Sequence, residues 1–168
     1  MKIFLIATFG LAAFAQTIDF NLDAVAAKAK KKAEVTLEGP MLAQALQKAP
    51  EKVKGSVANV SRLVVRNYEF DKTGQYSDAD LEPIRKQVSA GTGWSRVVNT
   101  KEEHESVEIY MLASQGGKLG GFLLIAAEEK ELTVVHVVGS IDLASLQEVV
   151  KSTIAYDLST AGARAGER

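Results

Sequence analysis

Two histidines and the lack of cysteine limit the chemistry open to this chain. His104 lies in the charged run 101–105, which predicts an exposed side chain, and His136 lies inside an apolar run. No His-x-x-x-His or similar ligand spacing occurs, so we expect no metal site. Because the chain contains no cysteine, thiol catalysis and disulfides are impossible. The Gly-x-Ser-x-Gly turn of a serine triad is also missing, and we therefore expect no catalytic residue and no cofactor.

Two carboxylates, Glu128 and Glu131, bracket a predicted hairpin turn. Paired acids can perform acid–base catalysis or bind a cation, so a carboxylate-dependent hydrolase is one hypothesis. A solvated hairpin tip explains the same residues without a catalytic role, and we favour it. The glycine-rich stretch 116–121 precedes a strand rather than a helix, and it lacks the phosphate-loop pattern. We interpret this stretch as a turn.

Another group of polar residues lies on predicted strands. Strict alternation places Arg66 and Tyr68 on one face of their strand, and Glu108 and Tyr110 share a face of a later strand. A charged group among apolar neighbours needs a partner, and Glu108 is our candidate partner for Arg66. These four residues form the candidate partner-binding face, suited to an anionic or extended partner. A structural ion pair at the sheet edge is the alternative.

Hydrophobic periodicity predicts four helices and five strands. For the helix over 76–88 we prefer Asp80 to Ser77 as the cap, because that start places Pro83 in the first turn. A lysine cluster at 28–32 is interpreted as the solvated end of the first helix. The other helices are expected at 18–32, 40–49 and, behind the cap Asp142, 143–154, and the strands at 59–70, 94–100, 107–112, 119–127 and 132–139.

This order predicts an α+β, two-layer fold. We expect a mostly antiparallel five-stranded sheet, built from one strand, a helix and then a four-strand meander, with helices packed mainly on one face. The hairpin 119–139 is the most apolar part of the mature chain and should form the core of the sheet. Residues 16–158 are expected to form a single domain, followed by a disordered tail over 159–168.

The N-terminus has the features of a secretory signal peptide over residues 1–15. Lys2 precedes an apolar stretch, and Ala13-Phe14-Ala15 is a small-x-small cleavage site. We therefore expect export to the periplasm or the extracellular space, with no stable membrane insertion after signal removal. The net charge is −1, which gives no basic surface for nucleic acid, so no nucleic-acid partner is expected.

Several short motifs resemble a known family through their order and spacing. They comprise Val-Arg-Asn-Tyr-Glu-Phe-Asp at 65–71, Tyr76, Asp-Leu-Glu-Pro-Ile-Arg at 80–85, Gly-Trp at 93–94, Glu-Ile-Tyr at 108–110, Glu-Leu-Thr-Val-Val at 131–135 and Gly-Ser-Ile-Asp at 139–142. Over about 19–154 the chain resembles the domain of unknown function 4252 family. This resemblance implies a bacterial exported protein, assigns no activity and supplies no catalytic residue.

Three functional hypotheses follow from the sequence. The leading one is a non-enzymatic, exported domain that binds a protein or peptide partner or is associated with the cell envelope. The second is the hydrolase acting through Glu128 and Glu131. The third is a peptide binder that adds a strand to an exposed sheet edge, for which the strand at 94–100 is the place to look.

Overall fold

A computed structural model describes residues 17–47, 59–89, 91–113 and 119–141. Within these ranges six strands and three helices follow one another along the chain. They are α1 (Asp23–Ala26), β1 (Lys31–Glu38), α2 (Gly39–Gln47), β2 (Asn59–Glu69), α4 (Asp78–Gln87), β3 (Trp94–Lys101), β4 (Glu105–Ala113), β5 (Leu119–Glu128) and β6 (Glu131–Ile141).

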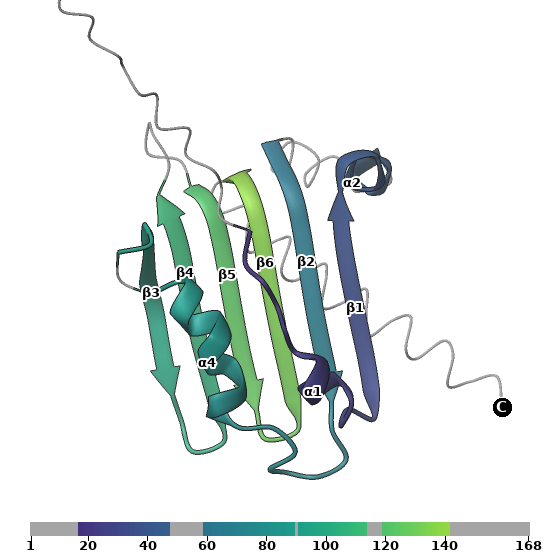
Figure 1. Ribbon diagram of the computed structural model, residues 1–168, viewed down its shortest axis with the longest axis vertical. Coiled ribbons are helices and arrows are strands. Elements are labelled where there is room, and N and C mark those ends of the chain that lie inside the picture. Colours follow the sequence, from purple (N-terminus) through teal and green to yellow (C-terminus); the bar gives the residue numbers. More distant parts are fainter. Residues whose placement is uncertain (1–16, 48–58, 90, 114–118, 142–168) are drawn as a thin grey trace, which may run out of the picture.

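The strands form one antiparallel sheet in the order β1-β2-β6-β5-β4-β3 (Figure 1). The predicted four-strand meander is confirmed as β3 to β6, and the predicted strand from residue 59 is β2, which pairs with β6. The α+β class is therefore confirmed, but the prediction of five strands is wrong. The sixth strand is β1, which pairs with β2 and forms one margin of the sheet.

The missing strand, β1, begins within the last two residues of the helix that we predicted over 18–32 and continues through residues that we did not assign to a strand. Only α1 is helical there, and β1 begins at Lys31. Ala33, Val35 and Leu37 alternate with polar residues, which is the period of a strand with one apolar face. The lysine cluster therefore does not end a helix: Lys31 already pairs with Glu69 across the strands at 2.9 Å.

The predicted core hairpin is confirmed as β5 and β6. Phe122 to Ile125 and Leu132 to Val138 are buried, and each strand has a paired neighbour on both sides. Consecutive residues of a strand point to opposite faces of the sheet, and here both sets are buried, as expected for a central strand.

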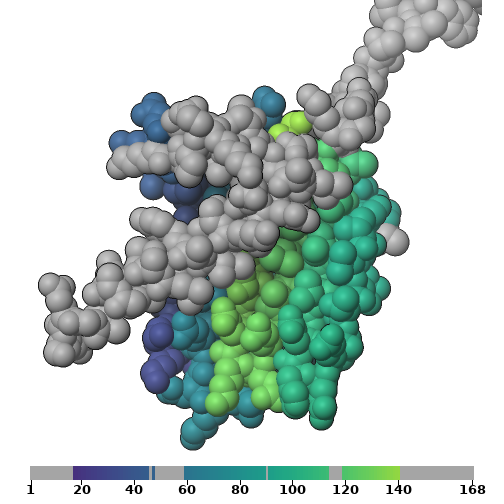
Figure 2. Space-filling model, turned by 180° about the vertical axis from the view of Figure 1, so that it is seen from behind, coloured from purple at the N-terminus to yellow at the C-terminus, as the bar shows by residue number. Residues whose placement is uncertain are grey.

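Two apolar clusters occupy the two faces of the sheet. On one face, α1, α4 and the stretch 17–22 lie over the strands, as Figure 1 shows from the front. Leu22, Leu81 and Ile84 from these segments pack against strand residues such as Tyr68 and Tyr110. The opposite face, seen in Figure 2, has its own cluster, made of Val65, Phe122, Leu124, Val135 and Val137.

Helix α4 begins three residues earlier than we predicted. Its N-cap is Ser77, not Asp80, and Asp80 is the third helical residue. The Asp80 carboxylate accepts hydrogen bonds from the Ser77 N–H at 2.8 Å and the Ser77 hydroxyl at 3.0 Å. These contacts satisfy groups at the helix start, and Pro83 is the sixth residue of the helix rather than part of its first turn.

Several predictions concern residues outside the described ranges. They are the signal peptide 1–15, the turn at 116–118, the capped helix at 143–154 and the tail 159–168. Among the described residues, no helix combines the length and apolar character needed to cross a bilayer.

Candidate functional site

A buried carboxylate connects β4 to helix α4. Glu108 lies on β4 with 4% of its surface exposed. The Arg85 guanidinium contacts its Oε1 through Nε at 2.9 Å and through Nη2 at 2.6 Å. The Tyr110 hydroxyl donates to Oε2 at 2.5 Å. Burial and this hydrogen bond raise the pKa of Tyr110, and nearby Arg96 partly opposes the rise. Glu108 is thus a buried charge with partners on both oxygens.

Arg85 uses all of its donor groups within the protein. Besides Glu108, it contacts the Asp78 carbonyl at 3.2 Å, Glu82 Oε1 at 3.1 Å and Asp78 Oδ1 at 3.0 Å. Burial by itself lowers the pKa of Arg85, but the hydrogen bonds to these three acids raise it overall above its ordinary value. The same guanidinium holds the pKa of Asp78 below its usual range. Arg85 is therefore a fixed structural cation rather than a free ligand for a partner.

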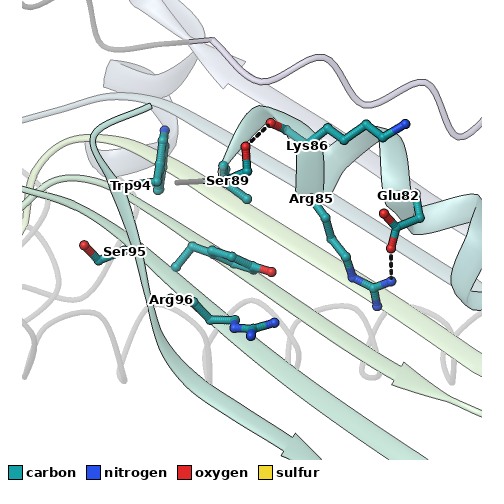
Figure 3. A pocket seen from close by; sticks show the side chains of 9 residues that line it. Glu82, Arg85, Lys86, Ser89, Trp94, Ser95 and Arg96 are labelled. Atoms are coloured by element: carbon teal, nitrogen blue, oxygen red, sulfur yellow. Dashed lines mark hydrogen bonds and ion pairs between the residues drawn. The ribbon is translucent and has the colours of Figure 1, made fainter. Parts of the chain in front are cut away.

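A pocket of about 590 Å³ opens above this network, between α4 and β3 (Figure 3). Three of its lining residues are cations, Arg85, Lys86 and Arg96, and one is an acid, Glu82. Arg85 and Arg96 approach each other across the pocket, whereas Lys86 runs along α4 with its ammonium directed away (Figure 3). The lining of this α4–β3 pocket comprises Glu82, Arg85, Lys86, Val88, Ser89, Trp94, Ser95, Arg96 and Tyr110.

Arg96 is the cation that remains available in the pocket. Its side chain is 49% exposed. Among the described residues, its one ion-pair contact within 4.0 Å is to Glu108 Oε2 at 3.7 Å, too long for a hydrogen bond. That oxygen already accepts the Tyr110 proton. A guanidinium placed in this way has donors left for an external carboxylate or other anion.

Trp94 forms the other end of the pocket and depends on a glycine. A Cβ atom at Gly121 would lie 2.9 Å from Trp94 Cη2, so the indole lies directly over Gly121. The indole also packs against the imidazole of the buried His136, with 5.9 Å between the ring centroids. Trp94 is the only tryptophan of the chain, and its fluorescence therefore reports on the pocket.

The family profile of a domain of unknown function, DUF4252, matches residues 27–149 and so includes every residue of the α4–β3 pocket. The chain belongs to the DUF4252 family. This finding confirms the family that the sequence motifs resemble. A search of curated proteins finds no match.

In this DUF4252 domain the four residues of the predicted partner-binding face do not form one site. Glu108 and Tyr110 lie beneath the pocket, but Arg66 and Tyr68 lie at the β1 margin. Arg66 donates to the Val35 carbonyl at 2.9 Å and to Thr36 Oγ1 at 3.1 Å, and the Tyr68 hydroxyl donates to Glu34 Oε1 at 2.8 Å.

The predicted pairing of Arg66 with Glu108 is therefore wrong. Both residues occupy the same row across the sheet, with Val134 and Ile125 between them. Three strand spacings separate their backbones by about 14 Å, which an ion pair cannot span. Arg85, from the helix that covers this face, takes the role of partner to Glu108.

The other candidate groups of the domain have local roles. Glu128 is exposed at the end of β5, and the Glu131 carboxylate accepts a hydrogen bond from Asn67 Nδ2 at 2.8 Å. The Tyr76 hydroxyl reaches the backbone carbonyls of both residues and closes this hairpin tip. Partial desolvation and nearby Glu131 raise the pKa of Glu128. Neither residue lines the α4–β3 pocket, and no group of three potential metal ligands occurs in the described ranges.

Neither Arg85 nor Arg96, the two arginines that define the pocket, was among the site residues predicted from the sequence. A signal for Arg85 was available, because Asp78, Glu82 and Arg85 recur at spacings of four and three and so share one side of a helix. The predicted helix start at Asp80 excluded Asp78 from that pattern. No comparable signal identifies Arg96, whose position depends on the edge strand β3 and its pairing with β4.

Proposed function

We propose that this DUF4252 domain is an exported, non-enzymatic binding module that holds a carboxylate of an acidic partner segment on Arg96. One observation carries the proposal: Arg96 is a half-exposed cation with unused donors at a pocket whose base is fixed by Arg85, Glu108 and Tyr110. Because this base is already fixed, binding requires the ordering of little more than the Arg96 side chain, and a small ordering cost favours affinity.

The composition of the pocket favours an acidic segment as the ligand. Of the three cations in the wall, Arg85 is paired within the protein and Lys86 points away, so Arg96 supplies the positive charge, and the one acid, Glu82, is paired with Arg85. Trp94 and Tyr110 supply apolar surface for the aliphatic part of a glutamate or aspartate side chain. Sites of this size usually combine an apolar wall with a few polar groups that fix the orientation of the ligand.

Export is the part of the proposal that rests on residues 1–15. Lys2, the apolar stretch and Ala13-Phe14-Ala15 support signal-directed secretion and cleavage before Gln16. The partner is then a protein or peptide of the bacterial envelope or the extracellular space. A cell-fractionation experiment that finds only the uncleaved chain, in the cytoplasm, would contradict this part and leave the proposed pocket unaffected.

Binding agrees better with the geometry than the two alternatives. A hydrolase needs its acids in a concave site, whereas Glu128 lies at an exposed hairpin tip and Glu131 is engaged by Asn67. Strand β3, where we expected a peptide to add, does lie at the margin of the sheet, but a bulge between Arg96 and Val98 interrupts its register, which disfavours strand addition at this edge.

The binding test uses the fluorescence of Trp94. Titration with an N-acetylated tetraglutamate peptide is expected to change the emission of Trp94, and tetraglutamine should cause no change. Arg96→Gln should weaken tetraglutamate binding about tenfold or more, because a charged hydrogen bond contributes roughly 1.5–3 kcal/mol. Binding should also weaken as salt is added.

Arg66→Gln is the matched control, since it removes the same charge at the β1 margin. It should bind tetraglutamate as the wild type does. If Arg66→Gln lost binding and Arg96→Gln retained it, the partner site would lie at the β1 margin instead of the pocket. No response of the wild type at millimolar peptide would reject the acidic-segment proposal.

A further inference from the structure

The margin of the sheet formed by β1 has the properties of an interface. Among the described residues, three large hydrophobic side chains are exposed: Val35, Met41 and Val97. Two of them, Val35 at 39% and Met41 at 64%, lie in the consecutive elements β1 and α2. Figure 1 places both elements at the same margin. Two exposed apolar side chains at one margin would be covered if a partner bound there.

Strand β1 also offers a regular edge for pairing. All eight of its residues pair with β2 without a register shift, and within the described ranges β2 is its one neighbour. The opposite margin differs, because β3 contains a bulge between Arg96 and Val98. A bulge keeps an edge strand from pairing, and β1 pairs with β2 without one.

We propose that β1 pairs antiparallel with β1 of a second copy of this chain, with Val35 opposite Val35 at the two-fold axis. This register places Lys32 opposite Glu38 of the partner and Ala33 opposite Leu37 of the partner. Lys32–Glu38 then pairs a cation with an acid, Ala33–Leu37 and Val35–Val35 pair apolar residues, and Glu34 lies opposite the polar Thr36. A parallel arrangement would place lysine beside lysine, so the charge pattern selects the antiparallel one.

The proposed contact extends the sheet without disturbing either copy. The β1 side chains that reach inward are already satisfied by β2, through Tyr68–Glu34, Arg66–Thr36 and Lys31–Glu69. Pairing therefore adds backbone hydrogen bonds at the edge and buries Val35 on both copies. The same patch serves both subunits, as a two-fold interface requires.

Engineered cysteines test both the contact and its register, because the chain contains no native cysteine. In the full chain, Val35→Cys should form a disulfide-linked dimer under mild oxidation, since directly opposed residues have Cβ atoms about 5 Å apart. Ala33→Cys should not form a disulfide-linked dimer, because residue 33 of the second copy lies four residues along the strand, about 14 Å away. Val97→Cys, on the other exposed edge, is the second control.

Sedimentation of the cysteine-free chain tests the interface without cross-linking. The wild type should show a concentration-dependent dimer, which Val35→Lys should abolish and Val97→Lys should leave intact. Circular dichroism checks that each variant is folded. A wild type that stays monomeric at high concentration, a dimer that survives Val35→Lys, or equal cross-linking of Val35→Cys and Ala33→Cys would overturn the proposal.

Discussion

His136 should make the stability of this protein depend on pH in the mildly acidic range. Its imidazole is buried between Phe20 and Trp94, and no described residue hydrogen-bonds to either ring nitrogen. Burial, with a smaller contribution from Arg62, lowers the pKa of His136 to about 4, from 6.5 for a free side chain. Between these two values the unfolded chain binds a proton that the folded chain excludes. Lowering the pH through this window therefore favours unfolding.

The size of the effect follows from the two pKa values. Above pH 6.5 the imidazole is neutral in both states, and His136 adds no pH dependence. The folded state loses about 2 kcal/mol of stability relative to the unfolded state by pH 5, and about 3 kcal/mol by pH 4. In urea denaturation, a loss of this size at pH 5 lowers the midpoint by about 1 M.

Urea unfolding of the wild type and His136→Leu at pH 7 and pH 5 measures the effect directly. Carboxylates titrate in both proteins, so their contribution cancels in the difference between the two free energies of unfolding. From pH 7 to pH 5, the free energy of unfolding of the wild type should fall by about 2 kcal/mol more than that of His136→Leu. His104→Gln keeps the buried imidazole and should follow the wild type. An equal difference at both pH values would refute a buried, neutral His136.

Three further substitutions test the elements that build the pocket. Gly121→Ala should displace the Trp94 indole, which lies 2.9 Å from the added Cβ, and should shift Trp94 emission to longer wavelength with a loss of roughly 1–3 kcal/mol of stability. Glu108→Gln removes the charge that Arg85 needs and should cost about 3–5 kcal/mol in thermal or urea unfolding; an unchanged stability would contradict a buried ion pair. Asp80→Ala removes the acceptor at the start of α4 and should cost about 1 kcal/mol in urea unfolding, and no change would argue against this cap.

The sequence was sufficient for those parts of the fold where periodicity is unambiguous. The runs around Phe122 and Val135 are too apolar and too rich in β-branched residues to be anything but central strands, and the meander followed from their spacing. At the edge the signal is weaker. Strand β1 buries little of its surface, so lysines and glutamates occupy half of its positions, and the short turn α1 before it has helical spacing of its own. Local pattern alone could not separate these two elements.

The candidate site was predicted only in part, and the reason is topological. Glu108 and Tyr110 were identified from strand alternation, which fixes the face but not the neighbours of a residue. The partner of Glu108 depends on the order of strands and on where α4 lies over the sheet. Because β6 and β5 lie between β2 and β4, Arg66 is too far away, and Arg85 reaches Glu108 from the helix above. Such contacts follow from the assembled sheet rather than from any single segment.

The two proposed contacts occupy opposite margins of the same sheet, so neither should block the other. Strand β1 and strand β3 are five spacings apart, or about 24 Å. In a dimer joined through β1, the two α4–β3 pockets would lie at the outer ends of a continuous sheet, roughly 50 Å from each other. A free peptide with one acidic segment should then bind equally to monomer and dimer. A partner with two such segments should bind the dimer more tightly than the monomer only if the linker between its segments spans that distance.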